Sequence, residues 1–110
     1  MNASIQDYND VIKTVQIYLD GGNVSGDAQK PAFHEAATIN AKPIQTLFDG
    51  VDELGPGDAT GHIDVLDIVN DIAAVRVTME NFHGADYIDF HLLMKTDEGW
   101  KIVAKVFTDK

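Results

Sequence analysis

The chain has 110 residues, of which 45% are hydrophobic and none is cysteine. This length supports one packed domain rather than two, and the lack of cysteine excludes disulfides and thiolate chemistry. Eighteen acidic residues against eight basic ones give a net charge of −10, which disfavours nucleic acid and anionic membranes as partners.

Residues 4–20 are expected to form an amphipathic helix, because apolar side chains recur every three or four positions. Ser4 followed by Asp7 has the spacing of a capping box, which marks a helix start. Gly21 and Gly22 are expected to end this helix by allowing a positive φ.

Two further helices are expected before the pattern changes. The first runs over residues 27–34 and is followed by a short strand at 37–40. Pro43 opens the second, which extends to Leu54, because proline is tolerated at the first helical position. The glycine-rich segment 55–57 stops it.

From His62 onwards the hydrophobic period becomes two, which is typical of strands. Tight turns at 70–71, 83–84 and 97–99 separate the segments. The pattern therefore predicts an antiparallel meander with strands at 62–69, 72–82, 85–96 and 100–108.

Alternation assigns each strand residue to one of two sheet faces. The more apolar set is expected to lie beneath the helices: Ala73, Val75, Val77 and Met79; Ile88, Phe90, Leu92 and Met94; Trp100, Ile102, Ala104 and Val106. The opposite set is richer in apolar groups than a solvent face needs, which suggests a homodimer interface. Its candidate residues are Arg76, Glu80, Tyr87, Asp89, His91, Val103, Lys105 and Phe107.

Asp89 and His91 lie two residues apart on that second face. They are interpreted as polar contacts of the dimer. A proton-shuttling pair or two metal ligands are the alternatives.

Two segments carry a resemblance to a known family. They are residues 27–40 and residues 87–107, the second including Asp97-Glu98-Gly99-Trp100. Together with the order of elements, they resemble the nuclear-transport-factor-2-like (NTF2-like) superfamily, in its lumazine-binding branch with relatives of the SnoaL-like and steroid-isomerase-like kind. The resemblance implies a cystatin-like cone, in which a strongly curved sheet wraps around helices and leaves a pocket, and a homodimer joined through the outer sheet face.

The enzymes of this superfamily imply specific side chains. Steroid isomerases need a tyrosine donor and two carboxyl groups. Tyr18 matches the tyrosine, but Ala41 and Leu92 align with the two carboxyl positions. The dehydratases need a histidine with an acidic partner. The candidates here are His34, His62, His83 and His91, of which His34 is carried into the predicted enzyme alternative.

The sequence therefore predicts a single α+β domain, residues 1–110, with N-terminal helices packed on a curved antiparallel sheet. Its predicted function is to bind a small apolar or aromatic molecule, with no cofactor or metal. The candidate pocket residues are Tyr18, Phe33, His34, Ile39, Asn40, Phe48, Phe90, Leu92 and Met94. An isomerase or dehydratase using Tyr18 and His34, and a dimerisation module without ligand, are the alternatives. A cytoplasmic location is expected, since no signal-peptide pattern is recognised.

Overall fold

The computed structural model describes residues 3–110. These residues form three α-helices, a 3₁₀ turn and six strands. In chain order they are α1 (Ile5–Gly21), α2 (Gly26–Gln29), the 3₁₀ turn η1 (Lys30–Ala32), β1 (Phe33–Ile39), β2 (Lys42–Pro43), α3 (Gln45–Leu54), β3 (Thr60–Val69), β4 (Ile72–Phe82), β5 (Ala85–Thr96) and β6 (Gly99–Asp109).

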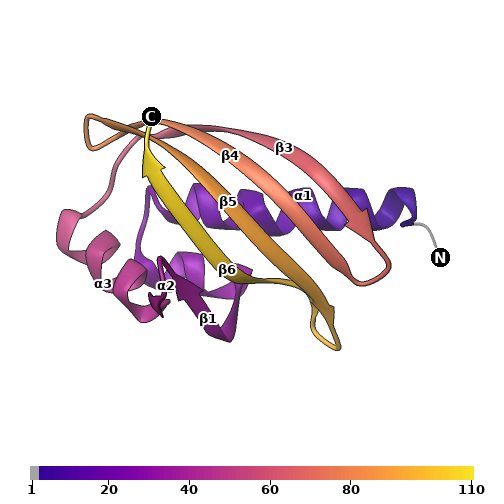
Figure 1. Cartoon of the computed structure of the whole chain (residues 1–110). Coiled ribbons are helices and arrows are strands. Elements are labelled where there is room, and N and C mark those ends of the chain that lie inside the picture. The colour runs from indigo at the N-terminus through magenta and orange to yellow at the C-terminus, as the bar shows by residue number, and fades with distance from the viewer. Residues whose placement is uncertain (1–2) are drawn as a thin grey trace.

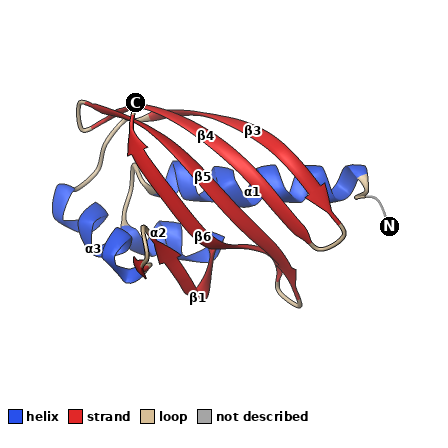
Figure 2. Cartoon of the chain, in the orientation of Figure 1, coloured by secondary structure: helices blue, strands red, loops and turns tan. Residues whose placement is uncertain are grey.

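The strands form one six-stranded sheet in the order β2-β1-β6-β5-β4-β3. Strands β3 to β6 are the expected antiparallel meander, but β1 pairs with β6 in parallel. The sheet is therefore mixed, which corrects the expectation of an antiparallel sheet. Figure 1 shows it curving across α1, with α2 and α3 at the end where β1 lies. The α+β class with helices packed on a curved sheet is confirmed, and Figure 2 shows this layering.

Helix α1 begins as the sequence predicts. The Ser4 hydroxyl accepts from the Asp7 backbone N–H, and the Asp7 carboxylate accepts from the Ser4 backbone N–H, which completes the capping box. The prediction for the helix end is wrong in its cause, because Gly22 has an ordinary φ of −62°. Gly21 serves close packing instead: a Cβ there would lie 2.7 Å from the Gln29 backbone nitrogen.

The second helix is shorter than expected. It ends at Gln29, and the 3₁₀ turn η1 contains Pro31 near its start. The chain is already extended at Phe33, with φ −112° and ψ 144°. Strand β1 therefore begins four residues before the predicted strand, and His34 lies on a strand rather than at a helix end.

Three β-bulges in the antiparallel meander decide which side chains face the helices. In β3 the pairing with β4 shifts between Val65 and Asp67, beside Leu66. In β4 the pairing shifts between Met79 and Phe82, where Asn81 has a φ of 61°. In β6 the pairing with β5 shifts beside Val103, which is the extra residue between Ile102 and Ala104. Because one inserted residue reverses the side-chain alternation, each bulge inverts the face assignment beyond it.

The face assignment of β5 was also wrong, although β5 pairs with β4 without a register shift from Ile72 to Met79. Asp89 and His91 are 1% and 0% exposed on the inner face, whereas Phe90, Leu92 and Met94 on the outer face are 54%, 55% and 46% exposed. The assignment of β4 was right, since its buried residues are Ala73, Val75, Val77 and Met79.

No helix within residues 3–110 combines the length and apolar character that a membrane crossing requires.

Candidate functional site

Four polar side chains meet on the inner face of the sheet, beneath α1. Tyr18 of α1 donates its hydroxyl hydrogen to Asp89 Oδ2 over 2.6 Å. The same oxygen lies 3.4 Å from His91 Nε2 and 3.8 Å from Lys105 Nζ. The β6 bulge creates this cluster, because it places Lys105 directly opposite His91 in the sheet. We call these four residues the inner polar cluster.

Burial and mutual contact shift the pKa of every member. Burial raises the pKa of Tyr18 well above its usual value, and the Asp89 carboxylate raises it further. Burial also favours the neutral form of Asp89. The hydrogen bond from His91, the charge of Lys105 and the hydrogen bond from Tyr18 outweigh it and lower the Asp89 pKa. Burial lowers the pKa of His91 and of Lys105, and Asp89 opposes both shifts in part. The cluster therefore holds a carboxylate beside an amine and an imidazole that lose protons readily.

Three buried polar groups in or beside the cluster have unused hydrogen-bonding capacity. One is His91, whose Nδ1 has no hydrogen-bond partner among residues 3–110. Within residues 3–110 the Lys105 ammonium makes no hydrogen bond, although it lies over the rings of Phe107 (4.3 Å) and Tyr18 (5.4 Å). Gln29 donates to the Tyr18 carbonyl, but its Oε1 has no hydrogen-bond partner in the described part of the chain. Because unpaired buried polar groups are costly, these groups are candidates for contact with a ligand.

The cluster lies at the base of a hollow with mainly apolar walls. The inner chamber has a volume of about 110 Å³, and its lining includes Tyr18, Gln29, Asp89 and Lys105. A neighbouring outer chamber of about 250 Å³ shares five lining residues with it. They are Ile39, Leu47, Val51, Phe82 and Phe107. Together the chambers reach the lower end of the range of roughly 300–1,000 Å³ found for ligand pockets.

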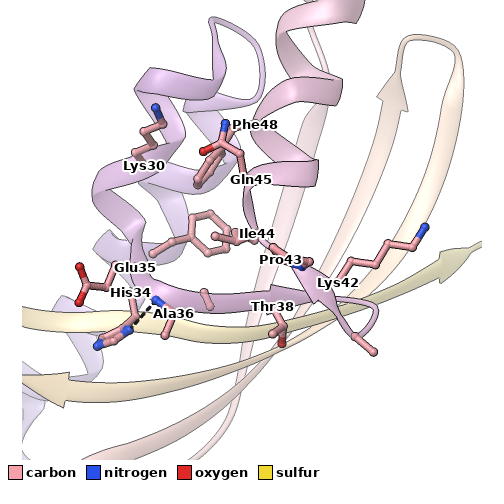
Figure 3. A pocket seen from close by; sticks show the side chains of 13 residues that line it. Lys30, His34, Glu35, Ala36, Thr38, Lys42, Pro43, Ile44, Gln45 and Phe48 are labelled. Carbon is pink, nitrogen blue, oxygen red and sulfur yellow. Dashed lines mark hydrogen bonds between the residues drawn. The ribbon is translucent and has the colours of Figure 1, made fainter.

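A wider groove of about 660 Å³ lies between β1 and α3. Figure 3 shows Ile44 and Phe48 on its helical side, while His34 and Thr38 project from the opposite side of β1. The His34 ring accepts from the Ala36 backbone N–H within its own strand. The groove therefore has room but none of the coupled titratable groups of the inner chamber, which makes the smaller hollow the better candidate site.

The predicted pocket residues fall into three groups. Tyr18 and Ile39 line the inner chamber, and Asn40 borders the outer one. Phe33, His34 and Phe48 line the groove. Phe90, Leu92 and Met94 cannot line any inner cavity, because they lie on the outer face; Leu92 and Met94 border a hollow there together with Val103.

The residues predicted for a dimer interface divide between the two faces. Arg76 and Glu80 are exposed on the outer face. Tyr87, Asp89, Lys105 and Phe107 line the inner chamber instead. His91 is fully buried beside them, so the interpretation of Asp89 and His91 as dimer contacts is wrong.

Asn40 has a structural role that the sequence did not indicate. It lies in the turn between β1 and β2 with a φ of 45°. Its Oδ1 accepts from the Phe107 backbone N–H over 2.9 Å, and its own backbone N–H donates to the Lys105 carbonyl over 2.9 Å. Asn40 therefore holds the segment of β6 that presents Lys105 and Phe107 to the hollow.

Sequence reasoning missed Gln29 as a site residue, and it reached Asp89, His91 and Lys105 for a different role, that of dimer contacts. The sequence did contain a signal, since Asp89, His91 and Lys105 are charged or titratable residues within largely apolar strands. Within residues 3–110, no third histidine, cysteine, aspartate or glutamate joins Asp89 and His91 to make a metal-ligand set. The arrangement can instead bind a carbonyl or carboxylate oxygen and move protons.

Comparison with known proteins agrees with this fold. Residues 6–108 match the family described as "Putative lumazine-binding". An NTF2-like protein of unknown function from Methylobacillus flagellatus KT is 31% identical, with a TM-score of 0.91 over 98% of this chain and 95% of that one. A second, from Shewanella baltica OS155, is 29% identical, with a TM-score of 0.90 over 100% and 98%. A protein of Cladobotryum sp named aldolase FrzH is 30% identical over 92% of this chain and 90% of its own.

Proposed function

The chain belongs to the "Putative lumazine-binding" family and is an NTF2-like small-molecule-binding domain, and we propose that its ligand is a small, mainly apolar or aromatic molecule with a carbonyl oxygen. The observation that carries this proposal is the Lys105 ammonium, buried at the base of the inner chamber without a hydrogen bond in residues 3–110.

The chemistry of the chamber specifies the ligand class. An ammonium with unused hydrogens attracts an oxygen acceptor, while Leu47, Val51 and Phe82 provide apolar contact for the rest of the molecule. The free Gln29 Oε1 accepts from an N–H or O–H group. Lumazine carries both carbonyl and N–H groups, so it is one member of this class to test.

Binding can be tested by saturation-transfer NMR with acetophenone, benzaldehyde and lumazine as probes. We expect at least one probe to bind, and Lys105→Met to weaken it at least about tenfold, because a hydrogen bond to a charged group contributes about 1.5–3 kcal/mol. His34→Ala is the matched control and should leave affinity within about twofold. Absence of binding by all three probes, or equal affinity in Lys105→Met, contradicts the proposal.

A second candidate function is proton transfer next to a carbonyl group, as in an aldol or isomerisation reaction. The convergence of Tyr18, Asp89 and Lys105 in one chamber, each with a shifted pKa, favours it. The name of the Cladobotryum relative, an aldolase, supports the same class of chemistry. In this reaction Lys105, as the neutral amine, removes the proton, and a donor near the oxygen stabilises the enolate.

Proton transfer can be measured as exchange of the methyl hydrogens of acetophenone in D₂O, followed by proton NMR. We expect the protein to accelerate exchange above the buffer rate and Lys105→Met to remove the acceleration. If acetophenone binds but its hydrogen-exchange rate equals the rate in buffer, the proton-transfer function is contradicted and the binding function remains.

We further propose that two copies associate through their outer sheet faces. Seven large apolar side chains are exposed on β3 to β6: Leu66, Val69, Ile72, Phe90, Leu92, Met94 and Val106. Arg76 and Glu80 lie exposed on the same face of β4, so a two-fold axis lets Arg76 of one copy meet Glu80 of the other. An apolar centre with charged neighbours is typical of homodimer interfaces.

Light scattering after size exclusion tests this association. We expect a dimer for the natural chain and a monomer for Leu92→Asp, since a buried unpaired carboxylate is costly. Ile5→Asp, at an exposed apolar position on α1, is the control and should remain a dimer. A monomeric natural chain contradicts the proposal.

A further inference from the structure

We propose that Lys105 is an amine nucleophile that forms a reversible imine with a small aldehyde or ketone in the inner chamber. This inference rests on the proposed binding of carbonyl compounds and goes beyond it, because it assigns a covalent bond to one side chain. Within residues 3–110, Lys105 is the sole lysine among the residues that line the inner chamber.

The surroundings of Lys105 suit such a nucleophile. Its side chain is 6% exposed, and its ammonium lies over the rings of Tyr18 and Phe107. Burial favours the neutral amine, which carries the nucleophilic lone pair. Because no hydrogen bond within residues 3–110 holds Nζ, the lone pair is free to approach a carbonyl carbon.

Asp89 can manage the protons of the reaction. The ammonium gives one proton to Asp89, 3.8 Å away, and the amine then adds to the carbonyl carbon to form a carbinolamine. The hydroxyl leaves as water when the proton held by Asp89 returns to it, and the nitrogen retains one hydrogen. The ammonium and the carbonyl compound thus give an iminium ion and water, so atoms and charge balance without another reactant.

The resulting iminium keeps the charge arrangement of the resting site. It replaces one cation by another beside the Asp89 carboxylate, and that carboxylate is supported by the hydrogen bond from Tyr18. The chamber of about 110 Å³ sets the size of the reacting end. A three-carbon carbonyl fits there, while a larger substituent must extend into the outer chamber.

Reductive alkylation of the natural protein tests the proposal. Propanal with cyanoborohydride at neutral pH converts imines into stable propyl-lysines, and peptide mapping by mass spectrometry ranks the lysines by rate. We expect Lys105 to react faster than the exposed Lys13, since burial lowers the pKa of Lys105 and so raises its fraction of neutral amine at neutral pH. If Lys105 is buried but not reactive, the order of labelling rates should be reversed, with Lys105 among the last lysines to react.

The outcomes separate this proposal from the binding function. Fast labelling of Lys105, slowed by acetophenone, supports the imine. Protection of Lys105 together with acetophenone binding overturns the imine and leaves the binding function in place. Protection without binding of any carbonyl probe overturns both. Lys105→Arg, checked for folding by circular dichroism, should lose the fast label and retain the slow labelling of Lys13.

Discussion

Replacing Asp89 by asparagine should destabilise the protein because it leaves the Lys105 charge buried without a partner. Breaking one side of a buried ion pair costs about 3–5 kcal/mol. Lys105 can avoid carrying an unpaired buried charge by losing its proton. Deprotonation at pH 7 costs at most about 4.6 kcal/mol, because each pH unit below the usual lysine pKa of about 10.4 costs about 1.36 kcal/mol. We therefore expect Asp89→Asn to lower the free energy of unfolding at pH 7 by about 3–4 kcal/mol.

The same reasoning predicts how this loss changes with pH. At pH 9 the cost of discharging Lys105 is at most about 2 kcal/mol, so the effect of Asp89→Asn should shrink accordingly. Lys105→Met in the Asp89→Asn background should recover part of the lost stability. Urea unfolding followed by the fluorescence of the single tryptophan, Trp100, measures all three effects. An Asp89→Asn effect that is equal at pH 7 and pH 9, or a double variant whose losses simply add, would refute this account of the cluster.

Three further predictions concern the scaffold and its pH response. Gly26→Ala should lower the free energy of unfolding by at least about 2 kcal/mol, because the added Cβ would lie 2.6 Å from the Phe48 carbonyl oxygen. Gly50→Ala should raise the free energy of unfolding by about 0.5–1 kcal/mol, because Gly50 lies in α3 with open space around it. Urea unfolding compares the two variants, and equal effects would contradict the close packing at Gly26. Ala41→Gly should stabilise by about 0.5–1 kcal/mol, because Ala41 has a φ of 65°; a thermal midpoint below that of the natural chain would count against this. Burial lowers the pKa of His91, so the unfolded chain binds a proton at this histidine before the folded chain does as pH falls. The free energy of unfolding should therefore decline below about pH 6.5 by at most about 1.4 kcal/mol per pH unit. His91→Gln should remove this contribution to the pH dependence of stability, and an unchanged pH dependence would disprove the prediction.

Local patterns were sufficient for most of the scaffold. The capping box at Ser4, the turn at Asn70-Asp71 and the turn at 97–99 each depend on neighbouring residues, and the structure has a helix start and two hairpins there. The inner face of β4 was also predicted correctly, because Ala73 to Met79 alternate without interruption. Such signals need no knowledge of the strand partner.

The site depended on pairing that one sequence does not reveal. Nothing in the residues around Asn81 and Val103 indicates that each adds one residue to its strand. The assumption that the more apolar set of β5 must face the helices was reasonable. It failed because Asp89 and His91 are stabilised beneath α1 by Tyr18 and Lys105, while the apolar set lies on the outer face.

The most direct test of the central claim is to observe where a carbonyl ligand binds. NMR spectra of protein labelled at the lysine side-chain carbons, recorded while acetophenone is added, distinguish the two hollows. We predict that the Lys105 signal shifts with ligand concentration, since Lys105 lines the inner chamber. Shifts at Lys30 and Lys42, which border the groove in Figure 3, with Lys105 unchanged, would contradict the account.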